Sequence, residues 1–181
     1  MKTESTVLYV LRLALTLLLI TAVVAAALAG VNSITKPEID KLTAQKTQAA
    51  IEAVLPGGGE VVEFPATDLV SKVYASETGY AVEVKPAGFD NTITMMVGVD
   101  KAGNVLGIDI ISHTETAGLG AVADAATPAG VSFRQQFVGM SGSVSVVKDG
   151  GEIEAITGAT ITSRAVCAGV NAALEVVGKM G

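Results

Sequence analysis

The chain contains one cysteine, Cys167, one histidine, His113, and no tryptophan. A single cysteine cannot form an intramolecular disulfide or a cysteine-only metal cage. A single histidine leaves a zinc site short of nitrogen and sulfur ligands, so neither a metal site nor metal catalysis is expected. A Ser-His-Asp hydrolase would have to use His113, and no nucleophile-elbow pattern accompanies that residue. We therefore expect no catalytic residues of these kinds.

Positive charge is also scarce, because 12 lysines and arginines stand against 18 acidic residues and the net charge is -6. No basic cluster is present, which argues against nucleic acid as a partner. Although 50% of the residues are hydrophobic, only 4% are aromatic, so the apolar positions are mostly Ala, Val, Ile and Leu. The 181 residues allow one medium domain plus an appendage.

An uncharged apolar run covers residues 13–31 and predicts a membrane anchor within residues 1–32. At about 1.5 Å per residue a helix of this length reaches about 28 Å, close to the hydrocarbon thickness of a bilayer. Arg12 lies at the near edge, where its stem can extend toward the lipid headgroups. Lys2 and Arg12 favour a cytoplasmic N-terminus, so we expect a single-pass protein of the cell membrane with an extracytoplasmic body.

A cleaved signal peptide is the alternative, because Ala27-Leu28-Ala29 before Gly30 resembles a cleavage site. The apolar run is longer than the usual signal-peptide core of about 7–15 residues, which favours a retained anchor in contact with lipid. The body of the chain is exported in either case.

A stalk helix and linker are expected over residues 33–58. Thr35-Lys36-Pro37-Glu38 matches a capping box with proline in the first turn, which predicts that a new helix begins there. The segment Pro56-Gly57-Gly58-Gly59 cannot continue a helix and ends it.

The remaining residues, 59–181, form the predicted exported domain. Several strands precede any further sizeable helix, which predicts an antiparallel sheet with flanking helices and an α+β fold. A short helix capped by Ser132 and a final helix over residues 163–177, with Gly178 past its end, should follow the sheet. The expected strands are 60–64, 69–75, 80–85, 92–99, 105–112, 144–148 and 153–156.

Two segments carry candidate chemistry. Residues 113–120 contain two glycines and polar side chains after a strand, and such loops are favoured places for ligand contacts. Residues 156–164 place hydroxyl side chains and Gly158 directly before the last helix. Backbone N–H groups and the helix dipole at such a terminus suit a phosphate, although an ordinary N-cap uses the same residue types.

With both segments in view, the chain resembles the FMN-binding G subunits of Rnf-type electron transport complexes. It resembles more distantly the C subunits of the sodium-pumping NADH:quinone reductase. The likeness covers nearly the whole chain: an N-terminal span, an exported body, and two motifs in order. The motifs read His-x-Glu-Thr-x-Gly-Leu-Gly from His113, and Thr157-Gly158-Ala159-Thr160 before the last helix.

The resemblance implies that a flavin transferase joins the phosphate of FMN to Thr160 as a phosphoester. It further implies that residues 115–120 lie near the isoalloxazine ring. Arg164 either pairs with the remaining charge of the phosphate or is a solvated surface arginine. The cofactor-binding residues expected beside Thr160 are Thr157, Gly158, Ala159, Thr162, Ser163, Glu115, Thr116, Leu119 and Gly120. The chain departs from the family pattern at Ala117, where proline is usual, and at Glu154, where aspartate is common.

The function implied is a non-autonomous redox subunit of an ion-translocating ferredoxin:NAD oxidoreductase. Its partners would be the other membrane and redox subunits of that complex. One alternative is a membrane-anchored binding or assembly module with no cofactor, in which the same motifs are only caps and turns. Another is an exported enzyme that uses His113 as acid or base.

Overall fold

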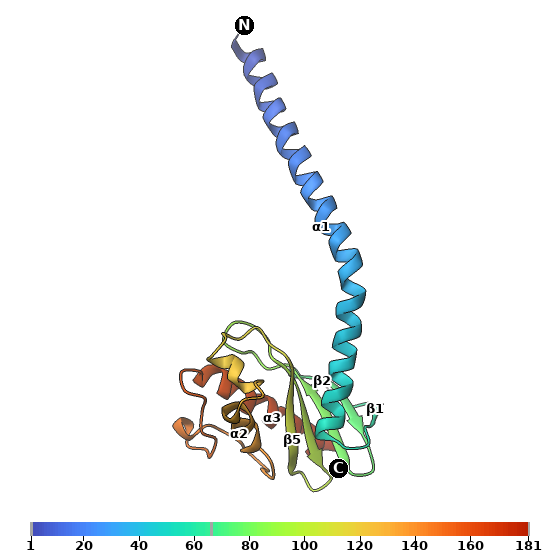
Figure 1. The fold of residues 1–181 in the computed structure, drawn as a ribbon, viewed down its shortest axis with the longest axis vertical. Helices are drawn as coiled ribbons and strands as arrows, with labels where there is room; N and C mark the ends of the chain where they lie inside the picture. The colour runs from blue at the N-terminus through green and yellow to red at the C-terminus, as the bar shows by residue number, and fades with distance from the viewer. Residues whose placement is uncertain (1, 66, 181) are drawn as a thin grey trace. The chain divides into compact units, whose positions relative to one another are not determined.

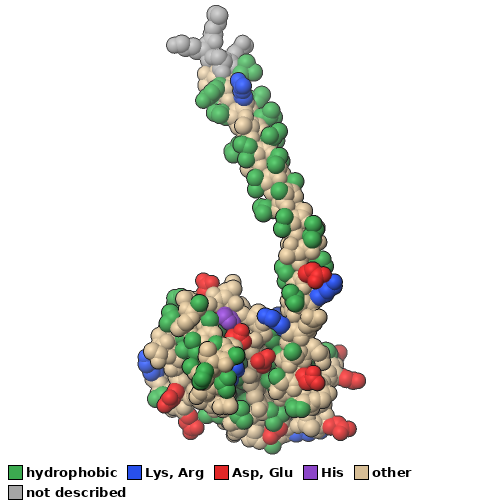
Figure 2. Space-filling model, in the orientation of Figure 1, with side chains coloured by type: hydrophobic (Ala, Val, Ile, Leu, Met, Phe, Trp, Pro, Cys, Tyr) green, Lys and Arg blue, Asp and Glu red, His purple; other side chains and the backbone are tan. Residues whose placement is uncertain are grey.

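The computed structural model describes residues 2–65 and 67–180, and the first element is one long helix, α1 (Lys2–Val54) (Figure 1). Its large apolar side chains from Val7 to Val31 are exposed, and Figure 2 shows hydrophobic side chains along the visible face of the helix. Within the described chain α1 is the one helix long and apolar enough to cross a membrane. The expected N-terminal apolar helix is therefore present.

The predicted helix start at Thr35 is wrong, because α1 continues through residues 32–35 without a break. The Thr35 hydroxyl donates to the Val31 carbonyl oxygen at 2.7 Å, inside the helix, instead of capping a new one. Hydroxyl side chains form this bond to the preceding turn when the helix has already begun, and Pro37 is carried inside the helix. The chain contacts divide into two compact units, Met1–Ala44 and Gln45–Gly181. The last turns of α1 thus belong to the second unit.

A five-stranded antiparallel sheet forms the centre of the second unit, with its strands in sequence order. Each strand pairs with the next along the chain, so every connection within the sheet is a local reversal. The α+β fold is confirmed. The strands are β1 (Glu60–Val62), β2 (Val70–Ala75), β3 (Gly79–Val84), β4 (Thr94–Asp100) and β5 (Val105–Ser112).

Both faces of the sheet are covered. Successive strand residues point to opposite faces, so Ala81 of β3 packs with the end of α1 while Val82 and Val84 pack toward the other side. That second face carries α2 (Pro128–Gln135) and α3 (Thr160–Met180), with the short 3₁₀ turn η1 (Gly120–Ala123) beside them (Figure 1). Helices on both faces bury the valine-rich strands in two apolar clusters.

The helix boundaries differ from those predicted at both ends of the domain. Thr127 caps α2, with Pro128 in its first turn, and Ser132 lies inside the helix. Thr160 begins α3, three residues before the predicted start at residue 163, and the helix continues past Gly178. Thr160 therefore lies in the first turn of a helix rather than in the loop before it.

The two strands predicted at 144–148 and 153–156 are wrong. They are reduced to one parallel bridge, Val146 to Ile153, and a 3₁₀ turn, η2 (Val147–Asp149). The side-chain amide of Asn171 accepts from Val144 N at 2.7 Å and donates to its carbonyl at 2.8 Å. Side chains from helices satisfy backbone groups here, so no neighbouring strand is needed.

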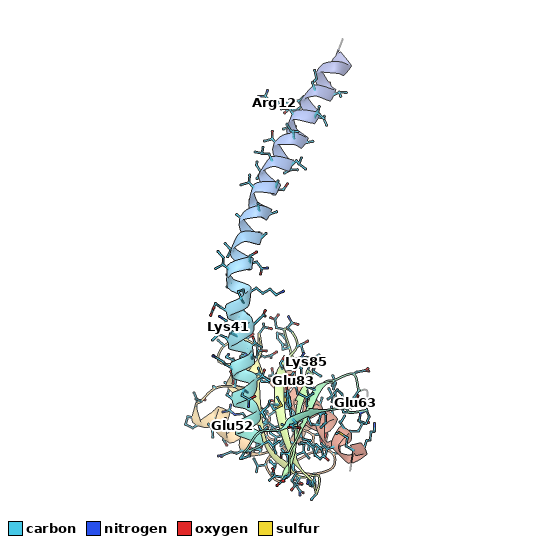
Figure 3. The ribbon with its side chains drawn as sticks, turned by 90° about the vertical axis from the view of Figure 1, so that its right-hand side faces the viewer. Arg12, Lys41, Glu52, Glu63, Glu83 and Lys85 are labelled. Atoms are coloured by element: carbon cyan, nitrogen blue, oxygen red, sulfur yellow. The ribbon has the colours of Figure 1, made fainter. Side chains whose placement is uncertain are left out.

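A buried acid lies on the face of the sheet that packs against the end of α1. Glu83 is 6% exposed and its carboxylate lies 3.4 Å from Lys85 Nζ; Figure 3 shows the two side chains together. Burial raises the pKa of neighbouring Tyr74, and the Glu83 charge raises it further. Glu83 is thereby paired within the protein, and we assign it a structural role.

Candidate functional site

A pocket of about 310 Å³ lies where the two sequence motifs meet. Residues 113–120 follow β5, and residues 158–162 comprise the turn before α3 and its first three residues. Two further segments complete the lining, the β3–β4 connection and η2. The lining residues are Phe89, Glu115, Thr116, Leu119, Gly120, Lys148, Gly158, Ala159, Thr160, Ile161 and Thr162.

The turn before α3 brings a helix N-terminus to the pocket. Gly158 has φ +76°, a left-handed conformation, and a Cβ there would lie 2.9 Å from Leu119 Cδ2. Ala159 N donates to the Ile156 carbonyl at 2.9 Å, which closes the turn, and α3 then begins at Thr160. The N–H groups of the first helical turn have no partner within the helix, so this wall favours an anion.

Two of the predicted site residues lie elsewhere. Ser163 is fully buried, and its hydroxyl accepts from Ile156 N and donates to the Ala159 carbonyl, both at 3.0 Å. It therefore holds the turn together rather than facing the pocket. Thr157 lines a separate pocket with Phe133 and Gln136. The other eight predicted residues are all part of the lining.

Arg164 is also committed to another partner. Its guanidinium donates to both carboxylate oxygens of Asp149, at 2.7 and 2.6 Å, in a two-point ion pair on the surface. The hydrogen bond from Arg164 holds the pKa of Asp149 below its ordinary value. The expected pairing of Arg164 with a ligand charge is not what this arrangement provides. The residue before Asp149, Lys148, is instead the one cation among the lining residues.

Glu115 joins three segments of the pocket wall and is only 8% exposed. Its Oε1 accepts from Phe89 N at 2.9 Å and from Asp90 N at 3.4 Å. Its Oε2 accepts from the hydroxyl of Thr162. Gly120 lies directly against this pair, because a Cβ there would overlap both Glu115 Oε2 and the Thr162 hydroxyl oxygen.

His113 supports the loop from outside the pocket. Its Nδ1 accepts from Glu115 N at 3.1 Å, and its Nε2 lies 3.7 Å from a carboxylate oxygen of Asp124. It is not among the lining residues. This position does not favour His113 as the acid or base of an enzyme.

Three lining residues were not predicted: Phe89, Lys148 and Ile161. Ile161 directly follows the Thr-Gly-Ala-Thr motif, so its position in the sequence pointed to the site. Phe89 stands in the turn-rich segment Gly88-Phe89-Asp90-Asn91, which is a weaker signal. Nothing local marks Lys148, because the bridge between Val146 and Ile153 brings it to the pocket.

The lining has the chemistry of a binding site for an apolar group that carries an anion. Phe89, Leu119 and Ile161 are 67%, 43% and 49% exposed, which is high for large apolar side chains. Polar contacts are available from the hydroxyls of Thr116 and Thr160, from the Lys148 ammonium group, and from the N-terminus of α3. The lining therefore combines exposed apolar surface with a few polar groups, as ligand-binding pockets do.

Comparison with known proteins agrees with this chemistry. Residues 88–175 match the FMN-binding domain family, a stretch that includes every lining residue of the pocket. The chain is 34% identical to the G subunit of the Na(+)-translocating ferredoxin:NAD(+) oxidoreductase complex of Acetobacterium woodii, over 92% of this chain and 91% of that protein. It is 30% identical to the G subunit of the ion-translocating oxidoreductase complex of Methanosarcina acetivorans, over 90% and 91%. A match of 41% to the G subunit of the proton-translocating ferredoxin:NAD(+) oxidoreductase complex of Clostridium ljungdahlii covers 58% of each protein.

Proposed function

The chain belongs to the family of G subunits of ion-translocating oxidoreductase complexes, and we propose that it transfers electrons in such a complex through FMN bound covalently at Thr160. One observation carries the proposal. The loop after β5 and the last three residues of the second motif, Gly158-Ala159-Thr160, are far apart in the sequence but line one pocket. The FMN-binding domain itself is established by the family match.

The residues of the pocket fit FMN. The phosphate would be held at the hydroxyl oxygen of Thr160, beside the first N–H groups of α3 and within the same lining as Lys148. The apolar side chains of Phe89, Leu119 and Ile161 would pack on the ring system, and Thr116 would hydrogen-bond its polar edge.

The covalent step requires a flavin transferase and an activated flavin phosphate. The hydroxyl oxygen of Thr160 forms a bond to phosphorus as the anhydride bond of the activated donor breaks. The displaced phosphate group departs with the electron pair of the broken bond and takes up the proton that the hydroxyl releases. Thr160 is half-buried in the first turn of α3, so its oxygen has access from the pocket. A threonine suits this role because it brings no redox chemistry of its own.

Bound flavin supplies one- and two-electron transfer, and the protein supplies its position and electrostatic surroundings. The apolar helix and the kinship with subunits of ion-translocating complexes make this a membrane-associated protein. We propose that α1 spans the membrane once, with its N-terminus cytoplasmic and the FMN domain outside. Residues 13–31 carry no charged side chain, so α1 offers no ion path and that path belongs to partner subunits.

The proposal is tested with Thr160→Ala in the full chain, produced together with a flavin transferase. Denatured wild-type protein should fluoresce in a gel and show the added mass of FMN, whereas the Thr160→Ala variant should show neither. Thr157→Ala is the matched control, because it removes a hydroxyl from the same motif but outside the pocket, and it should keep the flavin.

Flavin that persists on the denatured Thr160→Ala chain would refute the attachment site. Wild-type protein from its native membrane with the mass of the bare chain would favour the cofactor-free assembly module instead.

A further inference from the structure

Glu115 joins three of the four segments that line the pocket, through residues that are far apart in the sequence. Its carboxylate accepts hydrogen bonds from the backbone N–H groups of Phe89 and Asp90, which lie 26 and 25 residues before it. It also accepts a hydrogen bond from the hydroxyl of Thr162, which lies 47 residues after it. Its own loop supplies the third wall, through Leu119 and Gly120. The carboxylate therefore connects its own loop with the β3–β4 connection and with the start of α3.

We infer that Glu115 is a positioning residue that fixes the shape of the pocket, and that its charge lowers the reduction potential of the bound flavin. The inference rests on the proposed function, because it requires flavin in this pocket. It assigns Glu115 no bond to the flavin, since both carboxylate oxygens already accept hydrogen bonds from the protein.

The packing around the carboxylate supports the positioning role. A Cβ on Gly88 would overlap Glu115 Oε1, and a Cβ on Gly120 would overlap Glu115 Oε2. The carboxylate is thus enclosed from two sides by glycines at which any larger residue would displace it. No buried side-chain oxygen or nitrogen in the described chain lacks a partner, which includes both oxygens of Glu115. A group held this tightly keeps a constant distance to whatever occupies the pocket.

The sign of the effect on the flavin follows from electrostatics. Reduction increases the negative charge on the flavin, and a carboxylate in the same wall opposes that change. Glu115 is 8% exposed, so its field is less screened by water than that of an exposed group. Lys148 also lines the pocket, and its positive charge raises the reduction potential of the flavin. Because Lys148 is exposed, water screens this effect more. The effect of Glu115 should therefore be the larger of the two.

Glu115→Gln separates the positioning role from the effect of the charge. The glutamine amide has the same shape as the carboxylate but carries no charge. Its oxygen can accept from Phe89 N, and its NH₂ group can donate to the Thr162 hydroxyl. The midpoint potential of the flavin is measured by spectroelectrochemical titration of the full flavinylated chain in detergent. The Gln variant should have a higher potential than wild type, and Lys148→Gln, in the same pocket, a lower one by a smaller shift.

Glu115→Ala removes the hydrogen bonds together with the charge. It should lower the melting temperature and weaken the visible circular dichroism of the flavin, while Glu115→Gln retains both. If the Gln variant does not fold, Thr162→Val supplies the test of charge. That substitution leaves the carboxylate with one partner fewer, so the potential should fall below the value of the Thr162→Ser control.

Three results would overturn the inference: a Gln variant with an unchanged or lower potential, a raised potential in Thr162→Val, or an Ala variant with unchanged melting and dichroism. These outcomes are distinct from failure of the proposed function, which would appear as wild-type protein without flavin.

Discussion

Gly120 offers the sharpest stability test of the pocket, through the substitution Gly120→Ala. A methyl group at this position would overlap the two oxygens of the hydrogen bond between Glu115 and Thr162. That bond must open for the methyl group to fit. Opening a hydrogen bond to a charged group costs about 1.5–3 kcal/mol. Forcing a methyl group into a packed site adds about 1–3 kcal/mol. The expected loss of unfolding free energy is thus about 4 kcal/mol, a large part of the stability of a typical domain.

Gly118→Ala is the matched control in the same loop. Gly118 has φ +76° but nothing lies within 4 Å of its Cβ position. Its replacement therefore costs only the left-handed backbone strain, about 1–2 kcal/mol. The difference between the two variants isolates the overlap with the carboxylate.

Urea unfolding of the full chain in detergent measures both values. With no tryptophan present, the fluorescence of Tyr74 and Tyr80 in the sheet reports the state of the domain. The expected order is wild type, then Gly118→Ala, then Gly120→Ala as the least stable. Equal losses in the two variants, or a smaller loss for Gly120→Ala, would refute the reasoning that the carboxylate fills this space.

Two further groups allow tests that depend on pH. Burial raises the pKa of the Cys167 thiol from 9.0 to about 11, so iodoacetamide should leave it unmodified in the native protein and alkylate it only after unfolding. Because the folded state holds this proton more tightly, stability should fall as the pH rises from 9.0 to about 11, and Cys167→Ala should lack that fall. Burial, and then the charge of Asp124, raise the pKa of Asp109 above 3.8. As the pH rises, Asp109 therefore ionises in the unfolded chain before it ionises in the folded one. The free energy of unfolding falls between pH 3.8 and the pKa of Asp109 in the folded protein. Asp109→Asn removes this loss, so urea midpoints should show its advantage over wild type growing from acidic to neutral pH; a constant difference would contradict this.

Local patterns in the sequence were sufficient for the sheet. The strand expected at 105–112 is β5 (Val105–Ser112), and the other four strands of the sheet begin within two residues of the predicted positions. Alternation of apolar residues and the turn-forming residues between them are properties of neighbouring positions, so they can be read directly from the chain. The same holds for the uncharged run of residues 13–31 in α1.

Local patterns misled where polar groups have partners other than those that the pattern indicates. Thr35 resembles a helix cap, but the preceding turn is already helical and its hydroxyl bonds backward to Val31. Residues 144–148 have the composition of a strand, but Asn171 satisfies the backbone of Val144 in place of a neighbouring strand. The partner of Val144 lies 27 residues away and comes close to it only in the folded chain.

The sequence by itself determined the two motifs, the resemblance to a flavin-binding family, and the candidate attachment residue Thr160. The tertiary structure alone decided how the remaining side chains divide between binding and support. In the folded chain the Ser163 side chain points into the protein interior, Arg164 pairs with Asp149, and Lys148 lies in the pocket lining. Glu115 there links Phe89 and Thr162, which lie 26 and 47 residues away in the sequence. Such links cannot be read from the sequence, because hydrogen bonds depend on distance in space and not on separation along the chain.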